Sequence, residues 1–487
     1  MRMTEELQMA GLNGGTKTIG ASEFAEFAVS LRGDLLTKDV EGYDEARSVW
    51  NAMIDKKPAM IVQCFGVADV IASVKFAAKH QIVLAVRGAG HNIAGTAICD
   101  DGLLIDLSGW RSIHVDPEGK RARVEPGATL GDLDHETQAF GLATPTGINS
   151  TTGIAGLTLG GGFGWLSRKY GLTVDNLHAV DIVTADGALR HCSLTENRDL
   201  FWAIRGGGGN FGVITSFEFD LHLVGPTVMA GLVIHPFEKA QEVLQHYRHC
   251  VERMSDEMCV WMVARKAPPL PFLPAEWHGK PVIVLAACHI GTKAVAEKEL
   301  RELREWGQPI ADVIGPQPYS TWQTAFDPLL TPGARNYWKS HNLTEMNDAV
   351  IALVEEYGGR LPTTDTEIFF ARVGGAINRV SPQYTAYPHR DTKFIMNVHT
   401  RWSSPQDDDR CMAWAREFFT AIEPHATGGV YVNFIPSDEN RVANAYGPNM
   451  ARLSEIKREY DPQNLFRINQ NIKARHVTFH APSAARP

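Results

Sequence analysis

His91 is the residue of this sequence best placed for chemistry, because it sits inside a glycine-rich loop. The loop reads RGAGHN from Arg87 to Asn92 and runs on to Gly95. An imidazole can act as a nucleophile or carry a proton near neutral pH. Glycines allow sharp turns, and exposed backbone N–H groups in such a loop form a concave anion site. The pattern therefore predicts a diphosphate site with a nucleophile beside it.

Two further glycine-rich segments have the same character. NSTTGIAGLTLGGGFG spans residues 149–164 without a charged side chain, and RGGGGNFG spans residues 205–212. We expect all three loops to converge on one ligand, a large phosphate-bearing cofactor held mostly by backbone groups.

A nicotinamide dinucleotide fold is the alternative for the first loop. Gly88 and Gly90 follow an apolar run, and Asp106 ends another run at nearly the spacing that such folds use. Two features argue against it. Ile93 occupies the place of the third fingerprint glycine, and residues 92–102 carry no helical pattern to support a pyrophosphate.

Composition narrows the class of protein. The chain has 487 residues, enough for about three domains, with 44% hydrophobic and 21% charged residues. Its net charge of -9, without a Lys/Arg cluster, disfavours a nucleic-acid partner. Its 7 cysteines form no CxxC pair, so neither a metal site nor a disulfide framework is indicated. A polar N-terminus and the absence of a long apolar run predict a cytoplasmic protein outside the membrane.

The elements expected around the first loop form a β-α-β unit: a strand at 58–65, a helix at 67–80 and a strand at 82–86. Before it, helices at 21–31 and 43–54 make residues 1–57 a helical segment. After it, the pattern predicts strands at 103–107, 112–115, 121–124, 177–184, 191–193 and 212–223, and a helix at 129–141 with Thr129 as N-cap.

The composition changes near residue 226, where a second domain is expected to begin. Its strands are predicted at 228–234, 258–264, 282–288, 366–372 and 393–398, and its helices at 239–253, 293–306, 348–357 and 405–422. Four or five strands with helices on one face suit such a domain. An aromatic and polar cluster, with Tyr337, Trp338 and Lys339 among its members, is a candidate pocket lining.

Several longer motifs now support a resemblance. They are RGAGHN at 87–92, GIAG at 153–156, GGGFG at 160–164, RKYGLTVDN at 168–176, DLFWAIRGGG at 199–208, NFG at 210–212, YVNF at 431–434 and YDPQNLFR at 460–467. On these residues the chain resembles FAD-linked oxidases of the vanillyl-alcohol-oxidase type, and within them the berberine-bridge-enzyme-like branch. The resemblance covers residues 58–225 and 430–473, and it reaches the middle mainly through Tyr337 to Lys339.

The resemblance implies an α+β fold, in which a two-lobed FAD-binding domain of the PCMH type carries an inserted α+β substrate domain. The insert is expected to be an antiparallel sheet with helices on one face. The expected boundaries are a helical segment at 1–57, the FAD domain at 58–225, the substrate domain at 226–425, a berberine-bridge-like segment at 426–475 that completes the FAD domain, and a tail at 476–487.

FAD is the cofactor that the resemblance implies, with His91 joined to the 8α-methyl of its ring. The C8 methyl of oxidised flavin is weakly acidic, and its quinone-methide tautomer accepts a neutral imidazole nitrogen. The residues expected to hold FAD are Arg87, Gly88, Ala89, Gly90, His91, Asn92, Gly95, Thr146, Gly147, Ser150, Gly153, Gly156, Gly160, Gly161, Gly162, Gly164, Gly212, Val213, Ile214, Tyr431, Asn433 and Asn469.

One position departs from many members of the branch, which add a second link from a cysteine to flavin C6. The matching residue here is Asn149, so a single covalent bond is expected. That departure puts an oligosaccharide oxidase in doubt, although a sugar oxidase or a dehydrogenase with another electron acceptor stays an alternative.

The implied reaction moves hydride from a C–H next to oxygen or nitrogen of a small organic substrate to the flavin, with dioxygen as acceptor. Tyr431 is the first candidate base, with Tyr387 and His399 next, and a tyrosine base needs its pKa lowered from about 10. Residues 430–434 alternate as a strand does, which would place Tyr431 and Asn433 on one face. The residues expected to touch substrate are Tyr337, Lys339, Asn397 and Arg401.

Overall fold

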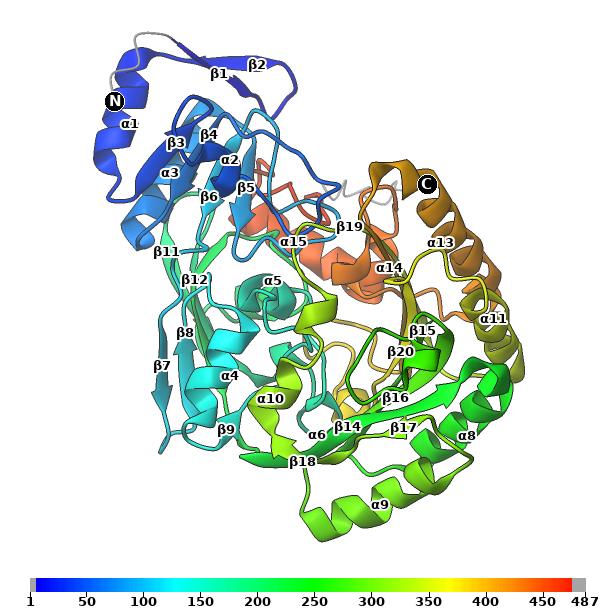
Figure 1. Ribbon diagram of the computed structural model, residues 1–487. Helices are drawn as coiled ribbons and strands as arrows, with labels where there is room; N and C mark the ends of the chain where they lie inside the picture. The colour runs from blue at the N-terminus through cyan, green and yellow to red at the C-terminus, as the bar shows by residue number, and fades with distance from the viewer. Residues whose placement is uncertain (1–5, 475–487) are drawn as a thin grey trace, which may run out of the picture.

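The computed structural model describes residues 6–474, so the tail expected at 476–487 lies outside the described part (Figure 1). Its main sheets have four, five and eight strands. The four- and five-stranded sheets form the two lobes expected for FAD, and the eight-stranded sheet lies between residues 227 and 402. The α+β class with an inserted antiparallel sheet is confirmed.

The four-stranded sheet presents the RGAGHN loop at the end of a buried strand. Its strands, in spatial order, are β3 (Asp34–Thr37), β4 (Met60–Gln63), β6 (Leu103–Asp106) and β5 (Leu84–Arg87), with α3 (Val67–His80) between β4 and β5 in the chain. The last three are parallel, so the helix returns the chain to the same edge. No helix follows between residues 92 and 102, which rules out the dinucleotide fingerprint.

Residues before 58 are less helical than predicted. α1 (Ala21–Ser30) is present, whereas α2 is a single turn at Tyr43–Ala46. A hairpin of β1 (Leu7–Ala10) and β2 (Thr16–Ile19) precedes them, and β3 joins the sheet. Four-residue strands are too short for apolar alternation to stand out.

The five-stranded antiparallel sheet forms the second lobe, in the order β11-β10-β12-β8-β7. Its strands are β7 (Ile113–Asp116), β8 (Arg121–Val124), β10 (Leu177–Val183), β11 (Leu189–Ser193) and β12 (Val213–Asp220), and β9 (Leu142–Ala143) pairs β13 (His222–Leu223) beside it. α4 (Leu130–Gln138) begins after Thr129, whose hydroxyl accepts from the Asp132 N–H as the predicted cap. α5 (Ile154–Leu159) carries the second glycine loop towards the centre of the molecule (Figure 1).

The third sheet is antiparallel throughout. Its path is β17 (Ala311–Asp312), β14 (Thr227–Pro236), β16 (Pro281–His289), β15 (Met258–Lys266), β20 (Glu367–Arg372), β21 (Phe394–Trp402) and β19 (Arg335–Leu343), and β18 (Gly315–Pro318) also pairs β14. β19 was not predicted. It reads RNYWKSHNL, and this mainly polar segment lacks the apolar alternation typical of a half-buried strand.

Four helices cover one face of this sheet (Figure 1): α8 (Ala240–Arg253), α9 (Lys293–Glu305), α11 (Asp348–Gly358) and α13 (Asp408–Ile422). Successive strand residues point to opposite faces, so Met262 and Met396 join the core under these helices. Trp261 and Asn397 point the other way, towards the glycine loops. We call this second surface the inner face.

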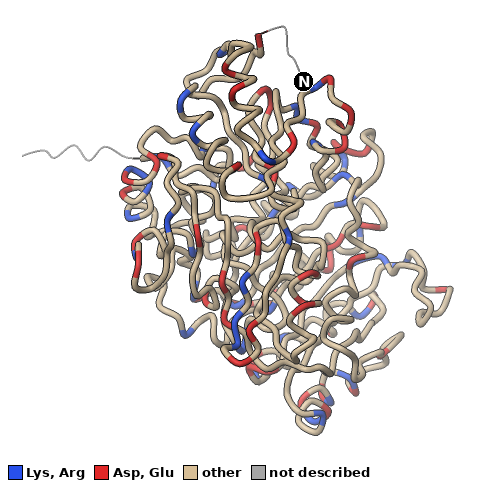
Figure 2. The backbone as a smooth tube through the Cα atoms, turned by 90° about the vertical axis from the view of Figure 1, so that its left-hand side faces the viewer, with Lys and Arg blue, Asp and Glu red and all other residues tan. Residues whose placement is uncertain are grey.

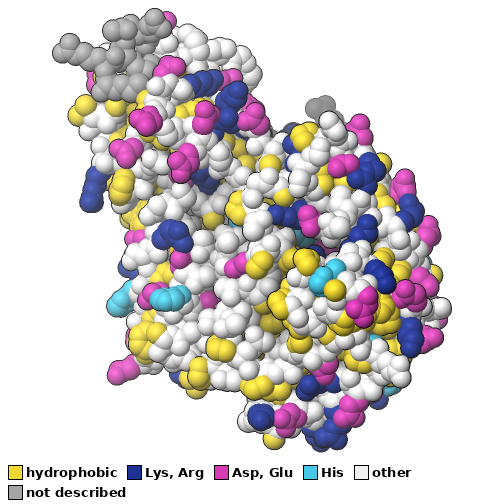
Figure 3. Space-filling view, in the orientation of Figure 1, with side chains coloured by type: hydrophobic (Ala, Val, Ile, Leu, Met, Phe, Trp, Pro, Cys, Tyr) yellow, Lys and Arg dark blue, Asp and Glu magenta, His cyan; other side chains and the backbone are white. Residues whose placement is uncertain are grey.

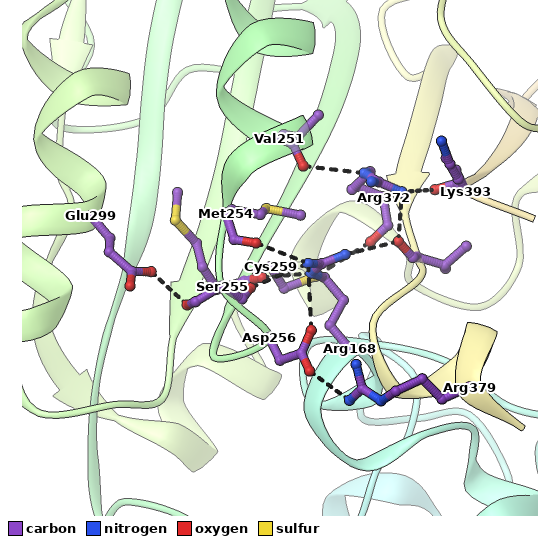
Figure 4. A network of polar contacts seen from close by, with 12 residues as sticks. Arg168, Val251, Met254, Ser255, Asp256, Cys259, Glu299, Arg372, Arg379 and Lys393 are labelled. Carbon is purple, nitrogen blue, oxygen red and sulfur yellow. Dashed lines mark hydrogen bonds and ion pairs between the residues drawn. The ribbon is translucent and has the colours of Figure 1, made fainter.

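Arg168 joins the FAD lobe to the eight-stranded sheet (Figure 4). It lies in α6 (Ser167–Tyr170) and is buried. Its guanidinium donates to the carbonyls of Met254, Ser255, Met258 and Val373 at 2.9–3.4 Å. A charged donor in a dry site makes strong hydrogen bonds, so this one side chain fixes the position of the sheet.

The C-terminal motif YDPQNLF also has a structural basis. Asp461 follows α15 (Met450–Tyr460) and accepts from the N–H groups of Leu465 and Phe466. The ammonium of Lys457, fully buried, lies 2.6 Å from the Asp461 carboxylate. A buried pair with its hydrogen bonds satisfied is costly to break, so the motif fixes the turn that closes the FAD domain.

Charged residues of both signs are interspersed along the chain (Figure 2) and over the face drawn in Figure 3. Within residues 6–474, none of the helices has the length and apolar character needed to span a membrane. All 7 cysteines are buried and unpaired.

Candidate active site

A large cavity separates the three glycine loops from the inner face. Its lining includes Gly88, Ala89, Gly90, His91, Asn92, Gly147, Ile148, Asn149, Thr152, Gly153, Gly156, Gly208, Gly209, Gly212, Val213, Ile214, Tyr431, Asn433 and Asn469. The structure thus brings together segments that lie more than three hundred residues apart in the chain.

The first loop offers unpaired backbone donors to this cavity. Within the described residues 6–474, no N–H group between Gly88 and Asn92 donates to another protein group. Backbone N–H groups are almost always paired with protein or with water, so a row without protein partners at a cavity wall is available to acceptors from a ligand. A diphosphate supplies such acceptors, and the loop therefore fits the phosphate-bearing part of FAD.

Other residues expected to hold FAD do not line the cavity: Arg87, Gly95, Thr146, Ser150, Gly160, Gly161, Gly162 and Gly164. Arg87 pairs with Asp106 at 2.6 Å, which anchors the loop from behind. A Cβ on Gly164 would lie 2.1 Å from the carbonyl oxygen of Thr146. The run from Gly160 to Gly164 therefore lets the chain pack closely against itself and does not bring backbone to a ligand.

His91 lies in the cavity wall with a defined partner at each side. Its ring stacks on Trp50, with centroids 4.8 Å apart, and its Nε2 lies 2.9 Å from Thr151 Oγ1. Burial lowers the pKa of His91 to about 4. The imidazole is therefore neutral at physiological pH, the form in which a ring nitrogen is a nucleophile.

Tyr431 borders the cavity, but it does not lie in the predicted strand. It precedes the single 3₁₀ turn η7 (Val432–Phe434). Its hydroxyl oxygen accepts from the Gly162 N–H and from Asn433 Nδ2, each at 3.0 Å. Burial raises the pKa of the phenol to about 12 although both donors act to lower it. The phenol therefore lacks the lowered pKa that a tyrosine base needs.

Two cations that could lower this pKa, Lys339 and Arg401, are engaged elsewhere. Lys339 pairs with Glu439 at 2.9 Å, and Arg401 donates to Thr331 and stacks on Trp50. Tyr387, another candidate base, does not line the cavity, and its ring lies against Gly161.

Tyr337 and Lys339 were expected to face the substrate, and the structure places both on the helix-covered face of β19. Tyr337 donates to Asp438, and Lys339 lies over the Phe419 ring of α13. Trp338, between them, lines the cavity instead. Successive residues of a strand point to opposite faces, and the prediction assigned Tyr337 and Lys339 to the face that Trp338 occupies.

His399 and Asn397 do line the cavity, with polar atoms that have no partner in the described part of the chain. The free atoms are His399 Nε2 and both ends of the Asn397 amide. His399 Nδ1 lies 3.3 Å from Oε1 of Glu367. Arg265 pairs with the other carboxylate oxygen, Oε2, at 2.9 Å. Burial acts to raise the pKa of Glu367, and Arg265 with His399 outweighs it, so the carboxylate is ionised.

Glu367 and Arg265 were missed at the sequence level. The available signal was an acidic residue two positions before Phe369 in a strand, which puts both on one face. Most of the surrounding wall is aromatic: Phe163, Trp165, Trp261, Phe326, Trp338, Phe369 and Phe434. The site is therefore an aromatic chamber with a small group of polar atoms on one side.

Comparison with known proteins gives consistent matches. The family models described as FAD binding domain and as Berberine and berberine like match residues 58–193 and 430–473. An FAD-linked oxidoreductase of Dictyostelium discoideum is 31% identical over 93% of this chain and 98% of its own. The (R)-6-hydroxynicotine oxidase of Paenarthrobacter nicotinovorans is 30% identical over 91% and 97%. The crystal structure of 6-hydroxy-D-nicotine oxidase from Arthrobacter nicotinovorans matches with a TM-score of 0.83 at 28% identity, over 92% and 99%.

Proposed function

Because this chain belongs to the FAD-linked oxidoreductases with a berberine-like C-terminal segment, we propose that it oxidises a small alcohol or amine with dioxygen as electron acceptor. Bound FAD supplies the hydride acceptor for a C–H next to the oxygen or nitrogen. The observation that carries the proposal is the unpartnered Nε2 of His399, a residue of the cavity wall whose Nδ1 faces Glu367.

His399 is the proton acceptor in this proposal. A carboxylate beside Nδ1 requires the proton on that nitrogen, which leaves the lone pair on Nε2. The same orientation by a carboxylate holds the base in catalytic triads. Nε2 then takes the O–H or N–H proton of the substrate as its C–H bond breaks, and Asn397 orients the same heteroatom. Tyr431, with its phenol protonated, holds Gly162 and Asn433 in place through these two hydrogen bonds.

His91 is proposed to hold the cofactor covalently through the 8α-methyl. The Thr151 N–H donates to Asn149 Oδ1, which fixes the orientation of that amide. The Thr151 hydroxyl donates to the same oxygen at 2.8 Å, so its proton is used. It accepts from His91 Nε2–H in consequence, and the lone pair lies on Nδ1. We expect Nδ1 to form the bond, with Asn149 and Thr151 as positioning residues.

Peroxide formation across a panel of alcohols, amines and sugars tests the activity. His399→Gln should lower the rate of anaerobic flavin reduction by about 10²–10⁴, the usual contribution of a general base. His341→Gln is the matched control, because His341 lies in the same sheet with Nε2 bonded to Phe419. Flavin reduction at the wild-type rate in both variants would show that the base is another residue. Failure to form peroxide with any substrate would reject the oxidase activity.

A further inference from the structure

The cavity does not end at the polar residues of the inner face. In the sheet register, Arg265 lies opposite Glu367, and Glu367 lies opposite His399. On the other side of Arg265 the neighbour is Val282. The cavity wall continues in this direction onto β16 and β14.

The character of the wall changes at β15. Six residues define what we call the apolar arm: Leu232, Ile234, Val263, Leu270, Leu273 and Val284. Val263 lies opposite Val284, which lies opposite Ile234, so the arm follows one row of side chains across three strands. Leu270 and Leu273 come from the β15–β16 connection and close its far end.

The six described residues that define the arm carry no hydrogen-bonding group in their side chains. Arg265 is the charged residue at its entrance, and its guanidinium is already paired with Glu367 at 2.9 Å. A hydroxyl buried here would lose its water partners without replacement, a penalty that disfavours sugars. Each methylene group that a ligand buries here should instead raise its affinity by about fourfold.

We propose that the arm binds the apolar tail of the substrate. The oxidised alcohol or amine carbon then lies at His399, and an alkyl or aryl group extends past Arg265 to β14. Two strand spacings separate β15 from β14, so the arm is about 10 Å long. This proposal rests on the oxidase activity proposed above and narrows its substrate to alcohols or amines with a long apolar tail.

Two homologous series test the arm on the FAD-loaded protein. In linear primary alcohols and amines, kcat/KM should rise about fourfold per methylene until the arm is filled. Tertiary alcohols with one lengthening chain lack a C–H on the carbinol carbon, so they report binding alone. Their affinity, read from the tryptophan fluorescence or the flavin spectrum, should rise by the same factor.

Val284→Phe should remove the dependence of affinity on chain length in the tertiary series, because the added ring fills the arm. Leu232→Phe provides a second variant in case the first does not fold. Affinity that stays flat along the tertiary series would overturn the arm, even if short substrates are oxidised. Rising affinity without peroxide from any substrate would keep the arm and reject the oxidase.

Discussion

The Nε2 atom of His91 lies 2.9 Å from the hydroxyl oxygen of Thr151, and that hydroxyl gives its own proton to Asn149. Asn149 stands where many relatives of the berberine-bridge type carry a cysteine that bonds the flavin. We propose that in this chain the position selects the tautomer of the histidine, which alone forms the covalent link.

Thr151→Val should slow covalent incorporation of FAD by about fivefold, because one hydrogen bond of about 1 kcal/mol no longer favours the Nε2–H tautomer. Flavin that survives denaturation, followed after FAD is added to protein made without it, gives the rate. Thr151→Ser keeps the hydroxyl and serves as control. The isolated flavin peptide should show attachment at Nδ1 by NMR, and attachment at Nε2 would contradict the relay.

Two glycines should fail in different ways. A Cβ on Gly156 would meet no protein atom within 4 Å, and the residue lines the cavity, so Gly156→Val should lower FAD content without a large loss of apoprotein stability. Gly162 has φ +75 and a Cβ position 2.1 Å from Thr173 Oγ1, so Gly162→Ala should lower the melting temperature itself. Equal flavin loading of Gly156→Val and wild type would remove this residue from the cofactor site.

Tyr431→Phe should leave the pH profile of flavin reduction unchanged between about pH 6 and 10. Burial raises the pKa of the phenol to about 12, so Tyr431 stays protonated over this range. Anaerobic stopped-flow traces at several pH values measure the profile. The loss of an alkaline limb in the variant would show that Tyr431 ionises during turnover and is the base after all.

Acid should destabilise the protein through two buried histidines. Burial lowers the pKa values of His235 and His341 to about 4, below the unfolded value of about 6.5. The unfolded chain therefore takes up protons first, and stability that is complete above about pH 6.5 is lost as pH falls towards 4. Each should contribute on the order of 2–3 kcal/mol to this loss.

Urea denaturation at several pH values tests this, and the double variant His235→Gln, His341→Gln should show a shallower decline of the free energy of unfolding. His135→Gln, at the surface, is the control. A double variant with the wild-type slope would contradict the assignment.

The glycine loops were predictable because their function requires a backbone composition that few other segments share. The alternation along β20 and β21 likewise predicts strands, and His399 and Asn397 follow from it. β19 could not be predicted from the sequence, because its polar side chains are buried against partners such as Asp438 and Glu439 from a distant segment. Without that strand, the parity that turns Trp338 inwards and Lys339 outwards is undetermined.

The four carbonyls held by Arg168 bear on how substrate enters the enzyme. Swinging the eight-stranded sheet away from the FAD lobe would break hydrogen bonds to a charged donor, each worth about 1.5–3 kcal/mol. A hinge of this kind is too costly for each turnover, so the two halves behave as one rigid body. We expect entry and exit to depend on local movement of loops such as the connection at residues 267–280, which closes the apolar arm, while the sheet and the FAD lobe keep their relative positions.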